Sequence, residues 1–138
     1  MVRSSPTVLL DAAHNPAGAG ALAAALSEAF AFTRLVGVVA MLADKDVRGV
    51  LEALEPVLAE IVITQSDSPR ALSADALAAV AVEVFGADRV EVAPRLDDAI
   101  EAAVSLAEEE GLGGTGVLVT GSVVTVGAAR RLLQSAAR

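Results

Sequence analysis

The sequence contains no cysteine, no tryptophan and no tyrosine, and it has only three phenylalanines in 138 residues. Without cysteine there is no disulfide, no thiolate nucleophile and no thiolate metal ligand, which is compatible with the reducing cytosol. Without tryptophan and tyrosine there is little to build a platform on which nucleic-acid bases stack. The composition therefore argues against thiol enzymes and against stacking binders of single strands.

Basic residues and long apolar runs are also scarce. Ten Lys and Arg face 18 Asp and Glu, giving a formal charge of -8, so the clustered cations that neutralise nucleic-acid phosphates are missing. No run approaches the roughly 18 to 20 apolar residues of a membrane span, and residues 1–5 lack the apolar segment of a signal peptide. We therefore expect a soluble, cytoplasmic protein with no nucleic-acid or membrane partner.

The length suits one domain with a single core. We interpret residues 1–6, which end in Ser4-Ser5-Pro6, as a linker remnant and residues 7–138 as the domain. Short β-branched runs in the domain alternate with stretches of helical periodicity. The expected strands are Thr7–Leu10, Leu35–Leu42, Glu60–Thr64, Arg89–Val92 and Gly116–Thr120.

Helices are expected between these strands and after the last one, with Asn15, Asp46 and Ser73 as N-caps. In the last helix, Val126, Ala129, Leu132 and Leu133 are expected to face inward. Because each helix must return the chain to restart a strand in the same direction, the pattern predicts parallel pairing. The expected fold is α/β and Rossmann-like, a doubly wound, mostly parallel sheet of five to six strands with helices on both faces.

Ligands of such sheets bind beyond the carboxyl ends of the strands, where loops meet helix N-termini. The first of these loops, Asp11–Pro16, contains a carboxylate that can accept two ribose hydroxyls. It also contains His14, the only imidazole of the chain, which can contact a phosphate or a carboxylate. The alternative is that Asp11 and Asn15 only satisfy backbone groups of the loop.

Two further loops contain candidate residues. Lys45, between Asp44 and Asp46, can bind a substrate carboxylate or phosphate, or it can lie on a solvated loop. The stretch Thr120-Gly121-Ser122 offers backbone N–H groups and a hydroxyl to an anion, although a serine N-cap would look the same. Arg70, in the turn Ser68-Pro69-Arg70, is equally usable as a clamp or as a tether.

Residues 18–23 match the dinucleotide pattern G-x-G-x-x-G/A, and Asp44 lies where a ribose-binding acid is expected. A stand-alone NAD-binding or nucleotide-binding module is therefore the alternative function. However, Asn15-Pro16 already starts the helix, so the small residues of this stretch are better explained by close packing of that helix on the sheet. A third alternative is a receiver-like α/β domain or one that only interacts with other molecules.

A complete catalytic set is not recognisable in the sequence. It has no phosphate-binding G-x-x-x-x-G-K-[ST] loop, no second histidine for a zinc site and no Ser/His/Asp arrangement with an elbow glycine pair. We therefore expect no metal site and no complete catalytic set in this chain.

Four segments, in order, resemble the folylpolyglutamate synthase/dihydrofolate synthase branch of the Mur ligases. They are Leu9–Pro16, Met41–Asp46, Ser68–Leu72 and Thr120–Gly127. The resemblance covers essentially Thr7 to Leu133 and corresponds to the C-terminal domain of that family. The sequence departs from the family at Ala12, where glycine is usual, and at Val124, where an aromatic residue is common.

The resemblance implies an ATP-dependent, ADP-forming amide ligase that joins L-glutamate to folate or dihydropteroate through an acyl phosphate. Asp11 and His14 would bind ATP, and His14, Lys45 and Ser122 would approach glutamate. The N-terminal ATPase domain of the parent protein, absent here, would hold Mg²⁺ and most of the folate site. The resemblance further implies a monomer and a fragment that is inactive alone. A G-x-x-x-x-G-K-[ST] loop encoded upstream of Met1 would support it.

Overall fold

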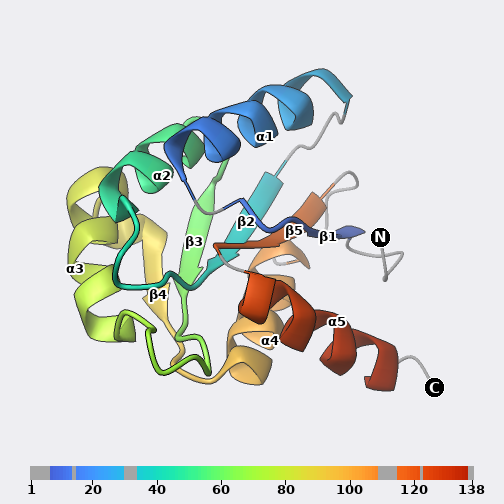
Figure 1. Cartoon of the computed structure of the whole chain (residues 1–138). Helices are drawn as coiled ribbons and strands as arrows, with labels where there is room; N and C mark the ends of the chain where they lie inside the picture. Colours follow the sequence, from blue (N-terminus) through green and yellow to red (C-terminus); the bar gives the residue numbers. More distant parts are fainter. Residues whose placement is uncertain (1–6, 14, 30–33, 109–114, 122, 137–138) are drawn as a thin grey trace.

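The structure is a computed structural model that describes residues 7–13, 15–29, 34–108, 115–121 and 123–136 (Figure 1). The interpreted linker (residues 1–6), His14 and Ser122 lie outside the described residues. Strands and helices alternate along the chain, as expected. The strands are β1 (Thr7–Leu10), β2 (Arg34–Val39), β3 (Glu60–Ile63), β4 (Val90–Val92) and β5 (Thr115–Thr120). The helices are α1 (Pro16–Ala29), α2 (Val47–Leu54), α3 (Ala74–Phe85), the short 3-10 helix η1 (Ala87–Arg89), α4 (Leu96–Glu108) and α5 (Val123–Ala136).

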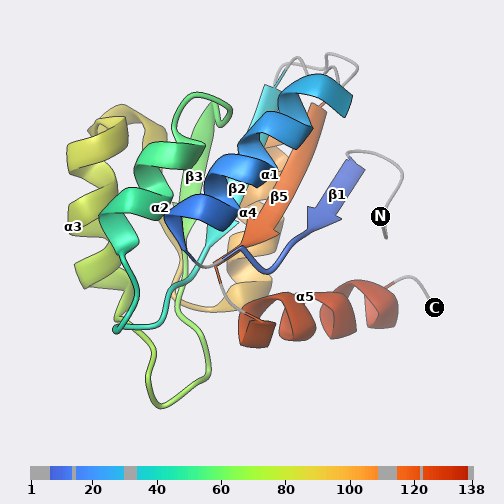
Figure 2. The same ribbon diagram turned by 45° about the horizontal axis from the view of Figure 1, so that its top comes forward.

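The five described strands form one sheet in the order β1-β5-β2-β3-β4, and every neighbouring pair is parallel. Because the crossovers from β1 to β4 all run in the same direction along the sheet, right-handed connections place α1, α2 and α3 on one face. The connection from β4 back to β5 runs the other way and places α4 on the opposite face, where α5 joins it (Figures 1 and 2). The predicted doubly wound α/β fold is confirmed.

Alternation along the central strands fills both layers of the core. In β2, Leu35 and Val39 pack under α1 to α3, whereas Val36 and Val38 pack under α4 and α5. All four are almost completely buried. Strands covered on both faces are continuously apolar, which is why this run was recognisable as a buried strand. The sheet is thus rigidly held from both sides, and its carboxyl edge is a stable base for loops.

The three expected N-caps are confirmed. The Asn15 side chain accepts a hydrogen bond from Gly18 N (2.7 Å), and Asp46 accepts one from Gly49 N (3.0 Å). The hydroxyl of Ser73 accepts one from the backbone N–H of the third residue of α3 (3.2 Å). Each bond satisfies an N–H that has no partner inside its helix, so these caps fix where α1, α2 and α3 begin.

Two expectations about element boundaries and facing residues are wrong. β2 ends at Val39 rather than Leu42, because the chain beyond it turns to pair with the β3–α3 loop: Leu42 and Ala71 form an antiparallel bridge. Leu132 was expected to face the core but is 40% exposed. It lines an open hollow at the end of the sheet instead of packing against a strand.

Candidate functional site

The carboxyl ends of three adjacent strands, β1, β5 and β2, bring the predicted site loops to one edge of the sheet. Asp11 directly follows β1, and Lys45 lies in the loop between β2 and α2. His14 and Ser122 lie outside the described residues, but the residues preceding them are joined, because Gly121 N donates a hydrogen bond to the carbonyl of Ala13 (3.1 Å). The β1–α1 and β5–α5 loops are therefore in direct contact.

The backbone of Asp11 is held by a hydrogen bond, and the residue is exposed to solvent. Its N–H donates to Val119 O (3.1 Å), which extends the β1–β5 ladder past the end of β1. Its Oδ1 accepts a hydrogen bond from Ala13 N (2.9 Å). A carboxylate has about four acceptor sites, so this bond orients the group and leaves acceptors for a ligand. The geometry is compatible with the ribose contact expected for Asp11.

Thr120 and Gly121 connect the end of β5 to the β1–α1 loop. The hydroxyl of Thr120, which is fully buried, donates to the carbonyl of Ala13 (3.2 Å). Gly121 has φ of +118°, and a Cβ at this position would overlap the carbonyl oxygen of Ala40 at the end of β2. Only glycine fits this crossing point. Sequence reasoning singled out this segment for its N–H groups but missed the bond from Thr120 to Ala13, which nothing local in the sequence signals.

Lys45 is half-buried, and within the described part of the chain its ammonium makes no ion pair. It thus offers a cation at the same edge as Asp11. Arg70 lies next to this loop, and its guanidinium is 3.6 Å from Asp44, with both side chains mostly exposed. Such a surface pair contributes at most about 1 kcal/mol. Arg70 also ties the two loops through its backbone, because its carbonyl accepts from Ala43 N (2.9 Å).

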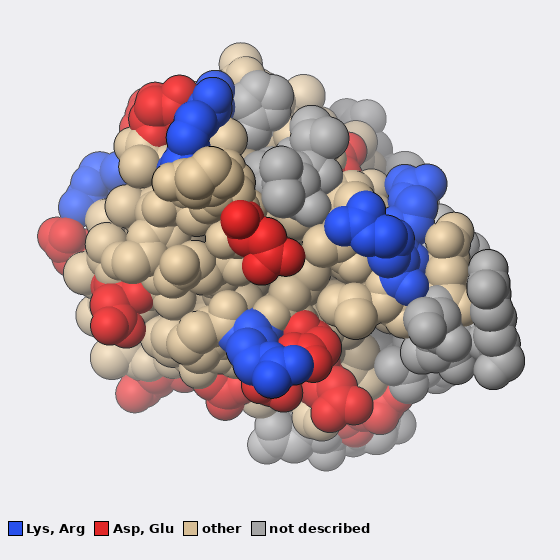
Figure 3. All heavy atoms as spheres, turned by 60° about the horizontal axis from the view of Figure 1, so that its bottom comes forward, with Lys and Arg blue, Asp and Glu red and all other residues tan. Residues whose placement is uncertain are grey.

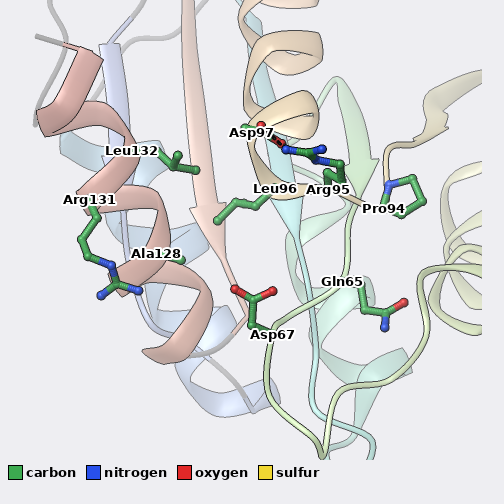
Figure 4. Close-up of a pocket in the computed structure, with 9 residues that line it drawn as sticks. All are labelled: Gln65, Asp67, Pro94, Arg95, Leu96, Asp97, Ala128, Arg131 and Leu132. Carbon is green, nitrogen blue, oxygen red and sulfur yellow. Dashed lines mark hydrogen bonds and ion pairs between the residues drawn. The ribbon is translucent and has the colours of Figure 1, made fainter.

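A second feature of this edge is a hollow of about 480 Å³ beyond β3 and β4 (Figure 4). Of the predicted site residues that the structure describes, neither Asp11 nor Lys45 lines it. Its walls come from the β3–α3 loop, the start of α4 and the outer part of α5. The lining residues are Gln65, Asp67, Pro94, Arg95, Leu96, Asp97, Ala128, Arg131 and Leu132.

Charges in this hollow balance. Arg95 donates two hydrogen bonds to the carboxylate of Asp97 (2.9 and 3.2 Å), and this contact, together with the N–H of Asp98, holds the pKa of Asp97 below its ordinary range. The remaining cation, Arg131, faces the carboxylate-bearing Asp67 across the opening. The described lining residues carry two positive and two negative groups and so give no net preference for an anion, and we do not identify the hollow with the nucleotide site.

Metal, membrane and nucleic-acid features were also sought in the described part of the chain. There, no group of three or more His, Asp or Glu side chains is placed to hold a metal ion. No described helix is both long and apolar enough to cross a membrane. On the face shown in Figure 3, Lys and Arg form separate groups with Asp and Glu nearby, not a continuous basic surface.

The dinucleotide pattern is explained without a dinucleotide. Gly18 N is already bonded to the side chain of Asn15, so it is not available to a pyrophosphate. Gly20 is exposed, and a Cβ there would meet nothing within 4 Å. Both glycines lie inside α1 rather than in the turn that precedes it. Among the small residues of this stretch, Ala19 is the fully buried position at which α1 packs into the core, whereas Gly20 is exposed.

Comparisons with known proteins agree on one family. The family described as "Mur ligase, glutamate ligase domain" matches residues 1–123. The chain is 53% identical to the dihydrofolate synthase/folylpolyglutamate synthase of Mycobacterium tuberculosis, over 95% of this chain and 29% of that protein. A crystal structure of M. tuberculosis folylpolyglutamate synthase complexed with ADP and AMPPCP superposes with a TM-score of 0.93 at 55% identity, covering 96% of this chain and 30% of the other.

A more distant structure shows the same fold. Escherichia coli FolC in complex with DHPP and ADP superposes with a TM-score of 0.81 at 28% identity, covering 97% of this chain and 30% of that protein. The chain therefore spans about three tenths of the length of these relatives, and its similarity concerns one part of each.

Proposed function

Because the chain belongs to the Mur ligase family, as a glutamate ligase domain, we propose that it is the C-terminal part of an ATP-dependent ligase joining L-glutamate to folate or dihydropteroate. In this proposal residues 7–138 form the domain and residues 1–6 the end of a linker from an N-terminal ATPase domain. The observation that carries it is the 53% identity to a dihydrofolate synthase/folylpolyglutamate synthase, combined with coverage of only 29% of that protein.

The reaction proposed for the parent protein has two steps. ATP phosphorylates a carboxylate of the folate or dihydropteroate substrate, and the amine of glutamate then attacks the acyl phosphate, so that phosphate leaves as the amide forms. This domain would bind ATP and glutamate and close over them, which orients the reactants and excludes water from the anhydride. Mg²⁺ would be held mainly by the N-terminal domain, as the resemblance to the family implies.

The site we propose consists of Asp11 and His14 for ATP and of His14, Lys45 and Ser122 for glutamate. Its support is that the loops bearing these residues follow strands that are adjacent in the sheet. Asp11 presents an exposed, oriented carboxylate, and Lys45 adds a cation without an ion-pair partner among the described residues. We further propose that the parent protein is a monomer of the cytoplasm, for which the absence of cysteine is suitable.

A domain exchange tests this function. Residues 7–138 replace the matching segment of the M. tuberculosis protein, and ADP release and amide formation are followed with ATP, L-glutamate and a folate substrate. This chimera should turn over, whereas the pure 138-residue chain should not. Turnover by the chain alone, or a folded chimera without turnover while the unmodified M. tuberculosis protein is active, would contradict the proposal.

The ATP contact is tested by Asp11→Asn in the chimera, because the amide keeps an oxygen for Ala13 N but loses the charge and acceptors. The KM for ATP should rise about tenfold, corresponding to a lost charge-assisted hydrogen bond, while the KM for glutamate stays within twofold. Asp88→Asn, an exposed carboxylate at the opposite edge of the sheet, is the matched control and should change neither constant. Equal effects of the two variants would argue against a nucleotide contact at Asp11.

A further inference from the structure

A buried hydroxyl beneath the proposed nucleotide site has a role that the family assignment does not supply. We infer that Thr120 is a positioning residue, which holds the Ala13 peptide and, through it, the carboxylate of Asp11 in the orientation that ATP requires. This inference rests on the function proposed above. It concerns a residue that touches no substrate and acts only through the β1–α1 loop.

The bonds around Ala13 form a continuous path. The Thr120 hydroxyl donates to Ala13 O (3.2 Å), and Gly121 N donates to the same oxygen (3.1 Å). On the other side of the residue, Ala13 N donates to Asp11 Oδ1 (2.9 Å). The carbonyl and the N–H belong to the two peptide groups that flank the Ala13 Cα, so a shift of Ala13 moves the N–H that orients the Asp11 carboxylate. In the sequence, the peptide group that contains the Ala13 carbonyl leads directly into residue 14, the second proposed ATP contact.

Packing alone does not account for a hydroxyl at position 120. The preceding residues of β5, 117–119, are Val, Leu and Val, all fully buried, and a valine at 120 would have the shape of threonine. The β1–β5 ladder is also already continued by the bond from Asp11 N to Val119 O. Burying a hydroxyl is unfavourable unless it is hydrogen-bonded, and here its partner is the loop carbonyl. The hydroxyl thus helps to hold the β1–α1 loop in place.

A second threonine provides the matched control. Thr64, immediately after β3, is also fully buried, and its hydroxyl donates to the carbonyl of Pro94 (3.1 Å), a residue of the β4–α4 loop. The residue type, the burial of the threonine and the kind of bond are the same as at Thr120, and the Thr64 bond differs in being only partly buried. The loop that Thr64 holds contains none of the proposed ATP or glutamate contacts, so any difference between the two sites reports on the Asp11 loop.

The kinetic test compares Thr120→Val, Thr120→Ser and Thr64→Val in the chimera. Thr120→Val should raise the KM for ATP about five- to tenfold, which is the effect of one lost hydrogen bond. The rise should be no larger, because Gly121 N still donates to the Ala13 carbonyl. The value of kcat should stay within twofold, and Thr120→Ser should restore the KM. Thr64→Val should lower the melting temperature to a similar extent without changing the KM for ATP. The same rise in KM for both valine variants would overturn the inference.

A second readout does not depend on ligase activity. In the 138-residue chain, Thr120→Val should speed hydrogen exchange of the Ala13 amide about tenfold, and Thr64→Val should not. The amide of Gly18, which is bonded locally to Asn15, is the internal reference. Unchanged exchange at Ala13 would overturn the positioning role even if the chimera is active. An inactive wild-type chimera would refute the proposed function separately, and the exchange data would still decide whether Thr120 holds the loop.

Discussion

Arg89 is expected to be one of the most sensitive surface positions of the fold. Its guanidinium donates to three backbone carbonyls, those of Glu55 (3.1 Å), Leu58 (2.7 Å) and Ala59 (3.1 Å). It also donates to the Glu55 carboxylate (2.8 Å) and lies 4.9 Å from the centroid of the Phe85 ring. These three carbonyls lie in the connection from α2 to β3, and Arg89 itself lies in the connection from α3 to β4. One side chain therefore ties together two connections at the amino edge of the sheet.

The cost of Arg89→Ala follows from these contacts. Hydrogen bonds to a charged donor contribute about 1.5 to 3 kcal/mol when buried, but the Arg89 side chain is 33% exposed, so we take about 1 kcal/mol for each carbonyl. The carboxylate and the ring add about 1 kcal/mol together, for a total of about 4 kcal/mol. Arg89→Lys keeps the charge but not the planar fork, and we expect it to lose about 2 to 3 kcal/mol.

Urea denaturation followed by far-UV circular dichroism measures these changes, since the chain has no tryptophan or tyrosine for fluorescence. Arg48→Ala is the matched control. Arg48 also donates two hydrogen bonds to a carboxylate, that of Glu83 (2.9 and 3.1 Å), but both side chains are about half exposed and no carbonyl is involved. Its loss should cost less than about 1 kcal/mol. A loss for Arg89→Ala within 1 kcal/mol of the Arg48→Ala value would refute the reasoning.

Three further predictions concern other single positions. Gly121→Ala should destabilise the chain by about 2 to 4 kcal/mol in the same assay, because the new Cβ overlaps Ala40 O and the positive φ is strained. Asp46→Ala removes the cap of α2 and should cost about 1 kcal/mol, with faster amide exchange in the first turn of that helix. The carboxyl of Asp97 should titrate below its ordinary pKa in NMR spectra, and Arg95→Gln should raise that pKa. Because the folded pKa is depressed, any stability from the Arg95–Asp97 pair is present at neutral pH and disappears as the pH falls through that pKa.

Features that depend on neighbouring residues were predictable from the sequence. A cap bonds an N–H only three residues ahead, so Asn15, Asp46 and Ser73 could be identified from their places before periodic apolar stretches. The α/β class followed from the alternation of elements, because parallel strands need crossovers. The location of Asp11 and Lys45 at the carboxyl edge of the sheet followed in turn from the α/β class, since both residues lie in loops that follow predicted strands. Their roles in binding stay a prediction.

Features that join distant segments were not predictable. The bond between Thr120 and Ala13 spans 107 residues, and the bridge between Leu42 and Ala71 joins two loops. Neither has a local sequence signal, because the residue type at one position does not reveal which distant group will be its hydrogen-bond partner. The exposure of Leu132 was missed for a related reason: its helical spacing is that of a core position, but the hollow beside it depends on where the β4–α4 loop ends.

The place of β5 between β1 and β2 has a consequence for how the chain acquires its structure during synthesis. Within this domain, β1 and β2 do not pair with each other in the native sheet, and each pairs with β5, a strand that is made some 75 residues after β2. Until then β1 has no native neighbour. We therefore expect the centre of the sheet to assemble last and folding to be slow for a domain of this size, as for other topologies dominated by distant contacts.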